Sequence, residues 1–513
     1  MSPFAAARVF SRGAPVARGE TMSFSLPTGR RRRLLVVVAP TVAAALLLAA
    51  CSSSKKAATA PSSSAAASAA TTSAAAPPAS ASAASSAATG SGAAPAPQAK
   101  TCADYAQYTS AATKGKTVTM FGSILPPESD SLNKSWAQFE SCTGIKIAYE
   151  GSNSFESQLP VRVQGGTAPD LAIIPQPGLL QQMVALGAVK APPAGVVANE
   201  DKYWNAAWKS YGSVNGTFYA APQSANMKSL VWYSPSAMSK AGYTIPTTWD
   251  QLAALSDKIA ATGTKPWCGG IGSGTATGWP ATDWLEETVL SSQGGQVYDD
   301  WVSHKIKFSD PQIQAAMTDV ANWMLNPKWV NGGYGDVKTI ATTTFQDAGK
   351  PILTGQCWFL QQASFYEAQW PKGTTVSPTG QVWAFYLPPR STSIPTPVEG
   401  GGEFTAAFSS DPATQAVQTY LSSPQWADSR IQVAPGWVSA NSGVDQSLYS
   451  DGIDKLSAQY LTNTKATFRF DASDLMPSAV GSGAEWTQMT AWFGSGASQV
   501  SVAKAIDAAW PAS

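Results

Sequence analysis

Residues 118–174 contain three short apolar runs in succession: VTMF at 118–121, IKIAY at 145–149 and LAII at 171–174. Each run has the length of a β-strand and is rich in β-branched or aromatic residues. The intervals between the runs are long enough to hold a helix. Because the order strand, helix, strand implies a parallel sheet with right-handed crossovers, we predict an α/β fold.

Helix signals occupy these intervals and recur further along the chain. Apolar residues at helical spacing follow Asp130, which we expect to cap a helix, and a second such series ends at Gly165. Thr248 begins a capping box, and Asp310 and Asp411 each precede a proline at the first position of a predicted helix.

Two further apolar segments, Ser229–Tyr233 and Val382–Leu387, are predicted strands at places where the chain could cross between two lobes. Ligands of open α/β sheets bind beyond the carboxyl ends of the strands. We therefore expect binding residues in the loops Gly122–Ser129 and Pro175–Gly178, which follow the first and third apolar runs.

The N-terminus has the order of a bacterial export signal. Four arginines at 30–33 precede an unbroken apolar run at 34–50, which ends in small residues before Cys51. Residues 1–50 therefore predict a lipoprotein signal peptide, and Cys51 is the expected lipidation site. The alternative is a transmembrane anchor, but the run is at the short end for a hydrocarbon core of about 30 Å. We expect the protein on the extracellular face of the cell membrane, attached through the lipid alone.

Composition divides the rest of the chain into a tether and a folded part. Residues 52–100 are almost entirely Ala, Ser, Thr, Pro and Gly, so 51–101 is predicted to be the lipidated cysteine and a disordered tether. About 400 residues remain, which is enough for two domains or lobes. The formal charge is +1, but residues 1–33 carry seven arginines and one glutamate, so the remainder is mildly acidic. This balance disfavours nucleic-acid binding, which needs a basic face.

Four cysteines remain after Cys51: Cys102, Cys142, Cys268 and Cys357. An even number in an exported chain favours two disulfides, although three pairings are possible. We expect the adjacent pairs, Cys102–Cys142 and Cys268–Cys357; the alternative is buried free thiols. The chain has one histidine, His304, in a polar stretch, so neither a zinc site nor Ser-His-Asp catalysis is expected.

Several segments carry a family resemblance. The generic ones are GGTAPDLA at 165–172, LVWYSP at 230–235 and TWDQL at 248–252. The more specific ones are KPWCGGI at 265–271, ATGWPATDWLE at 276–286, CW at 357–358, QASF at 362–365 and EGGGEF at 399–404. Together they resemble the extracellular solute-binding proteins of carbohydrate ABC transporters (family 1), and the specific segments are similar to the alpha-glucoside-binding members.

The resemblance implies a two-lobed periplasmic-binding-protein-like fold (type II). Its parallel-rich sheets would be flanked by helices, with a hinge between lobes that close on the ligand. On this basis 102–226 and 390–440 would form the N-terminal lobe. Residues 227–389 and 441–513 would form the C-terminal lobe.

Sugar recognition needs hydrogen-bond partners for hydroxyls and flat apolar faces for C–H surfaces. Trp279, Asp283 and Trp284 offer both in one stretch, unless either indole belongs to the core. Glu403 follows three glycines, which permit a close approach of a ligand; the alternative is a solvated loop. The weaker candidates for ligand contact are Glu128, Gln176, Lys228, Gln362 and Phe365.

These features predict a non-enzymatic, monomeric binding protein. It would capture a carbohydrate, an alpha-glucoside or related oligosaccharide, by hinge closure and deliver it to ABC permease subunits. No catalytic residue, metal or cofactor is expected, and the chain carries no nucleotide-binding motif. The alternatives are a secreted glycosidase, which needs two carboxylates about 5–9 Å apart, and a carbohydrate-binding surface lipoprotein.

Overall fold

The computed structural model describes residues 101–449 and 452–512. The predicted signal peptide, Cys51 and nearly all of the predicted tether therefore lie outside the described residues. Within the described ranges, no helix combines the length and apolarity that spanning a bilayer requires.

The first of two five-stranded sheets has the order β2-β1-β3-β14-β6. β1 pairs in parallel with β2 and β3, whereas β14 is antiparallel to both β3 and β6. The strands are β1 (Thr117–Gly122), β2 (Lys146–Gly151), β3 (Leu171–Ile174), β6 (Ala220–Pro222) and β14 (Phe404–Ala407). The three apolar runs of 118–174 thus form adjacent parallel strands, as predicted.

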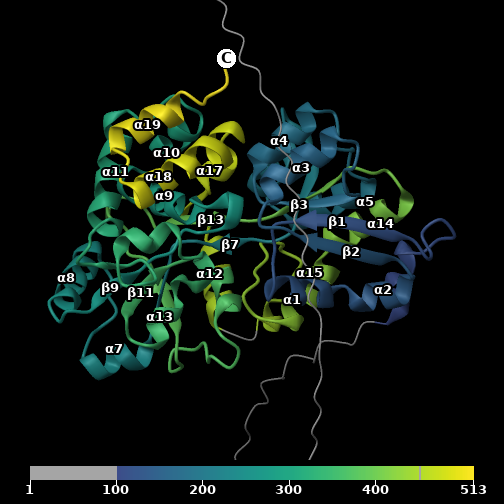
Figure 1. The fold of residues 1–513 in the computed structure, drawn as a ribbon. Helices are drawn as coiled ribbons and strands as arrows, with labels where there is room; N and C mark the ends of the chain where they lie inside the picture. Colours follow the sequence, from purple (N-terminus) through teal and green to yellow (C-terminus); the bar gives the residue numbers. More distant parts are fainter. Residues whose placement is uncertain (1–100, 450–451, 513) are drawn as a thin grey trace, which may run out of the picture. The chain divides into compact units, whose positions relative to one another are not determined.

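Both faces of this sheet are covered, which explains why its strands are continuously apolar. Leu171 and Ile173 pack into one hydrophobic cluster, while Ala172 and Ile174 pack into another. The helices of this lobe are α1 (Glu128–Ser135), α2 (Ala137–Thr143), α3 (Phe155–Gln164), α4 (Pro177–Ala185), α5 (Ala194–Tyr203), α6 (Ala206–Tyr211), α14 (Pro412–Leu421) and α15 (Pro424–Val433). This lobe also contains a two-stranded antiparallel ribbon, formed by β4 (Ser213–Val214) and β5 (Thr217–Phe218). In Figure 1, α14 lies beside the blue strands β1 and β2 although it comes from much later in the chain.

The second sheet has the order β10-β9-β11-β8-β12. Its strands are β8 (Leu230–Tyr233), β9 (Lys265–Cys268), β10 (Val330–Asn331), β11 (Cys357–Gln361) and β12 (Trp383–Tyr386). The helices of this lobe are α7 (Pro235–Ala241), α8 (Trp249–Ala260), α9 (Trp279–Gln293), α10 (Gly295–Val302), α11 (Pro311–Met324), α12 (Phe345–Ala348), α13 (Lys350–Leu353), α17 (Ala472–Leu475), α18 (Trp486–Ser495) and α19 (Gln499–Asp507). Figure 1 shows the yellow helices α17, α18 and α19 gathered with α9, α10 and α11.

A three-stranded sheet, β15-β13-β7, lies where the chain passes between the two lobes. It contains β7 (Asn226–Met227), β13 (Pro397–Gly401) and β15 (Thr467–Phe470), and α16 (Gly452–Leu461) packs on β7 and β13. The prediction that Ser229–Tyr233 and Val382–Leu387 are the crossing strands is wrong, since these segments form β8 and β12 inside the second sheet. β13 and β15 contain glycine or charged residues and β7 has only two residues, so these strands lack the apolar signal that marks a buried sheet.

The helix predicted to begin at Asp130 begins at Glu128, directly after Pro127. Proline suits this position because the first turn of a helix needs no N–H donor from it. The helix is also interrupted at Trp136, which separates α1 from α2. By contrast, the Thr248 side chain caps α8 by accepting from Gln251 N, as expected.

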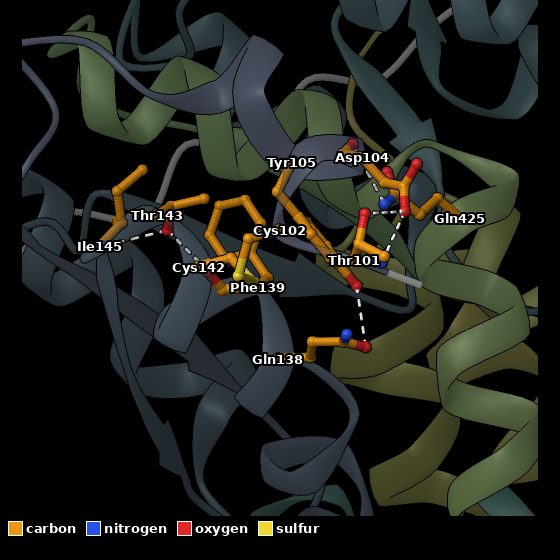
Figure 2. Close-up of a disulfide and its surroundings, with 10 residues drawn as sticks. All are labelled: Thr101, Cys102, Asp104, Tyr105, Gln138, Phe139, Cys142, Thr143, Ile145 and Gln425. Carbon is orange, nitrogen blue, oxygen red and sulfur yellow. Dashed lines mark hydrogen bonds between the residues drawn. A yellow bond between two sulfur atoms is a disulfide. The ribbon is translucent and has the colours of Figure 1, made fainter. Parts of the chain in front are cut away.

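Both disulfides join the expected pairs. Cys102, at the start of a 3-10 helix, is bonded to Cys142 of α2 with a Cα–Cα distance of 5.0 Å. Figure 2 shows this bond, with Tyr105 and Phe139 packed edge to face beside it. Cys268 and Cys357 connect the neighbouring strands β9 and β11 at a Cα–Cα distance of 5.5 Å.

Candidate ligand-binding site

A cavity of about 380 Å³ is lined by loops from both lobes and by the crossing strands. The first lobe contributes the loops that follow the carboxyl ends of β1, β2 and β3, as expected for an α/β sheet. The second lobe contributes residues before and at the start of α9 and α12. The site is therefore built from segments far apart in the sequence.

Three half-buried glutamates form an acidic wall on the first-lobe side. Glu128 begins α1, Glu156 lies in the first turn of α3, and Glu403 precedes β14. Burial raises the pKa of Glu128 and of Glu156 to about 7 and the pKa of Glu403 to about 8. The charge of Glu128 also raises the pKa of Glu403. The positive charge of Arg430 lowers the pKa of both Glu128 and Glu403, but by less than burial raises them.

Three aromatic rings form an apolar wall on the second-lobe side. The Trp279 ring lies 5.0 Å from Phe345 and 6.1 Å from Phe365, centroid to centroid. All three side chains are partly exposed to the cavity. Such rings offer flat faces to the C–H groups of a ligand.

Lys228 is the one cationic residue on the cavity wall, and it lies between two buried carboxylates. Its Nζ donates to Asp283 Oδ1 at 2.7 Å and to Asp471. Burial lowers the pKa of Lys228, but these carboxylates outweigh it and hold the pKa well above its ordinary value. Oxygen atoms of Asp283, Glu399 and Asp471 lie within 4.8 Å of one another, so the ammonium supplies positive charge where three carboxylates meet. Lys228 thereby ties α9 to the segment after β15.

Two acceptor atoms on the wall have no hydrogen-bond partner. They are Oε1 of Gln176, whose side chain is 5% exposed, and Oδ1 of Asn226, which is 8% exposed. Gln176 Nε2 donates to Glu156 Oε1 at 3.5 Å, which leaves its oxygen available. Buried acceptors of this kind call for donors from a bound molecule.

Direct contacts between the lobes flank the cavity. Asn153 O accepts from Thr275 N at 3.2 Å and from Thr275 Oγ1 at 3.1 Å. At the start of α4, a Cβ on Gly178 would lie only 1.9 Å from Met476 O. Glycine is thus required where the first lobe touches the segment after α17.

Six of the nine predicted contact residues line the cavity: Glu128, Gln176, Lys228, Trp279, Phe365 and Glu403. The other three do not. Trp284 is 4% exposed and packs edge to face on Trp267 in the core. Gln362 is buried beneath the cavity, where its carbonyl accepts from Trp232 Nε1. Asp283 does not line the cavity, but it accepts a hydrogen bond from Lys228, which does.

Sequence reasoning missed Glu156, Asn226, Phe345 and Asp474, which all line the cavity. The sequence does signal Glu156, because it lies just beyond β2, whose carboxyl end meets those of β1 and β3 at the same edge of the sheet. No local sequence pattern marks Phe345 or Asp474 as a cavity residue, because only the packing of the second lobe brings them to the wall.

The fold defines the class: a two-lobed α/β binding protein, here with a cavity between the lobes. The model of the family described as bacterial extracellular solute-binding protein matches residues 125–389. The chain belongs to this family, whose members bind solutes, and this confirms the predicted family and fold.

Two curated relatives are similar over most of their length. The chain is 36% identical to the alpha-glucosides-binding periplasmic protein AglE of Rhizobium meliloti, covering 77% of this chain and 87% of that protein. It is 34% identical to the osmoprotective compounds-binding protein GgtB of Synechocystis sp., covering 77% and 93%.

Solved structures share the fold at low sequence identity. The bacterial solute receptor AcbH matches with a TM-score of 0.65 and 18% identity, over 77% of this chain and 98% of that one. A chitin oligosaccharide binding protein matches with a TM-score of 0.64 and 15% identity, over 76% and 97%.

Proposed function

We propose that this protein captures an alpha-glucoside or related oligosaccharide by closure of its lobes and delivers it to an ABC permease. The observation that carries the proposal is the cavity between the lobes, with aromatic rings on one side and carboxylates on the other. The names of the relatives AglE and GgtB support this class of small polar ligand.

The wall chemistry suits a sugar. The rings of Trp279, Phe345 and Phe365 can cover the apolar face of a pyranose, while Glu128 and Glu403 can accept from its hydroxyls. The unpaired oxygens of Gln176 and Asn226 add two acceptors. Gly402 lets this part of the wall pack closely on the neighbouring chain, since a Cβ there would lie 2.3 Å from Ser224 O.

The proposal includes an anchor at Cys51 and a monomeric state on the extracellular face of the membrane. Its support is the order of arginines, apolar run and cysteine in residues 30–51. Mass spectrometry of the N-terminal peptide should find a diacylglycerol on Cys51, and Cys51→Ala should release the protein into the medium. An unmodified cysteine in the membrane fraction would contradict the anchor.

Calorimetry with maltose, trehalose and sucrose tests the binding function. We expect saturable, reversible binding of at least one sugar, with no release of reducing sugar during prolonged incubation. Absence of binding across a wide glycan panel would contradict the proposal. Steady release of reducing sugar would replace it with a glycosidase.

A further inference from the structure

The charges on the cavity wall are strongly unbalanced. The lining residues include five carboxylates, those of Glu128, Glu156, Glu403, Asp471 and Asp474, but Lys228 is their one cation. That cation is not free to meet a ligand, because its ammonium is held by Asp283 and Asp471. The wall therefore presents ionisable carboxyl groups without an uncommitted positive group among the lining residues.

Arg430 does not correct this imbalance at the ligand surface. Its side chain is buried and does not line the cavity, and its Nη1 donates to Ala434 O at 3.2 Å. It acts on Glu128 and Glu403 from behind, and burial still raises the pKa of both groups. The two glutamates thus remain short of compensating charge on the side that faces a ligand.

The uncharged groups of the wall also include acceptors that lack a hydrogen-bond donor. Gln176 Oε1 and Asn226 Oδ1 are buried acceptors without a partner, on different structural elements of the wall. A buried acceptor is costly when left unpaired, so a ligand rich in N–H and O–H donors fits best. An ammonium group supplies three donors and a positive charge at one point.

We propose that the cavity selects a polyhydroxylated ligand that carries a basic nitrogen, an amino-substituted glycoside, over the same sugar without it. This inference rests on the proposed function and narrows its ligand class. Hydrogen bonds from an ammonium to carboxylates are stronger than those from a neutral hydroxyl. A phosphate or uronate on the sugar would instead be repelled by the wall.

The test uses calorimetry at pH 7 on three kinds of probe: trehalose and maltose, their monoamino-deoxy analogues, and their 6-phosphates. At least one amino analogue should bind about tenfold more tightly than its parent, a difference of about 1.4 kcal/mol. The phosphates should bind more weakly than the parents.

Three variants assign the preference to the wall. Glu128→Gln, Glu156→Gln and Glu403→Gln each remove one ionisable carboxyl group with little change in shape, and at least one should reduce the amine preference to about twofold or less. Asp257→Asn is the matched control, because Asp257 is an exposed carboxylate of α8 and does not line the cavity. Thermal unfolding of each variant verifies that it is folded.

The outcomes separate the two hypotheses. If a parent sugar binds and no amino analogue binds more tightly, the inference is wrong and the proposed function stands. If the amine preference persists unchanged in all three glutamine variants, its assignment to this wall is wrong. If neither the parents nor the amines bind, and a wide glycan panel also fails, the proposed function itself is contradicted.

Discussion

Ligand binding at neutral pH should release protons from the acidic wall. In the ligand-free protein the pKa of Glu128 is raised to about 7 and that of Glu403 to about 8, chiefly by burial. Arg430 lowers the pKa of both glutamates, and Glu128 raises that of Glu403. Both glutamates raise the pKa of the neighbouring Tyr149, and Asp454 raises that of Arg430. A ligand that donates hydrogen bonds to the carboxylates favours their charged forms and lowers both pKa values.

The size of the effect follows from these values. At pH 7 a carboxyl with a pKa of about 7 is half protonated, and one with a pKa of about 8 is about nine-tenths protonated. Restoring both to ordinary values would release about 1.4 protons per bound ligand. By linkage, the association constant should rise about 25-fold per pH unit around pH 7 and level off above about pH 9.

Calorimetry at one pH in buffers with different ionisation enthalpies measures the released protons directly. The observed binding enthalpy should vary linearly with the buffer enthalpy, with a slope that reports about 1.4 protons released per ligand. Glu403→Gln should remove the larger share of this slope and Glu128→Gln the smaller, whereas Asp257→Asn should leave it unchanged. A slope of zero, or net proton uptake, for a tightly bound ligand would refute the reasoning.

Three further predictions concern affinity and stability. Trp279→Ala should weaken sugar binding about tenfold in calorimetry, because it removes a large stacking face. Tyr334→Ala, which removes an exposed ring outside this cavity, should leave the affinity unchanged. Equal sugar affinities for the two variants would contradict the aromatic wall. Asp283→Asn should lower the free energy of unfolding by about 3 kcal/mol, since it leaves the buried Lys228 short of a charged partner. Denaturant titration measures this loss of stability. A loss no larger than that of Asp257→Asn would contradict the prediction. Without ligand, the thermal midpoint should fall as pH rises from about 5 to about 8. The raised pKa values of Glu128, Glu156 and Glu403 mean that the folded state holds more protons than the unfolded state over this range; a midpoint that climbs across it would be inconsistent with their burial.

The sequence predicts a cavity residue correctly where a local pattern also determines the residue's place in the fold. Glu128 and Gln176 follow parallel strands, and the carboxyl ends of such strands meet at one edge of the sheet, so both could be placed at the site in advance. Glu403 could be placed because glycines precede it and a ligand can approach there.

Helix α9 shows where this reasoning fails. Trp279, Asp283 and Trp284 are close in sequence, but only Trp279, at the first turn, reaches the cavity. The helix is buried on almost every side, so it has no polar face that would distinguish ligand-facing from core positions. Which side of α9 faces the ligand depends on the packing of α11, α10 and α18 around it, which no local pattern encodes.

The place of β14 in the first sheet has a consequence for how fast the protein folds. β14 lies between β3 and β6, although Phe404–Ala407 comes long after Ala220–Pro222 in the chain. Until β14 arrives, β3 and β6 each present an unpaired edge, which is prone to pair with other chains. Closing such a long loop is slow, so completion of this sheet should limit the folding rate. During that interval the chain should be most prone to aggregate through these edges.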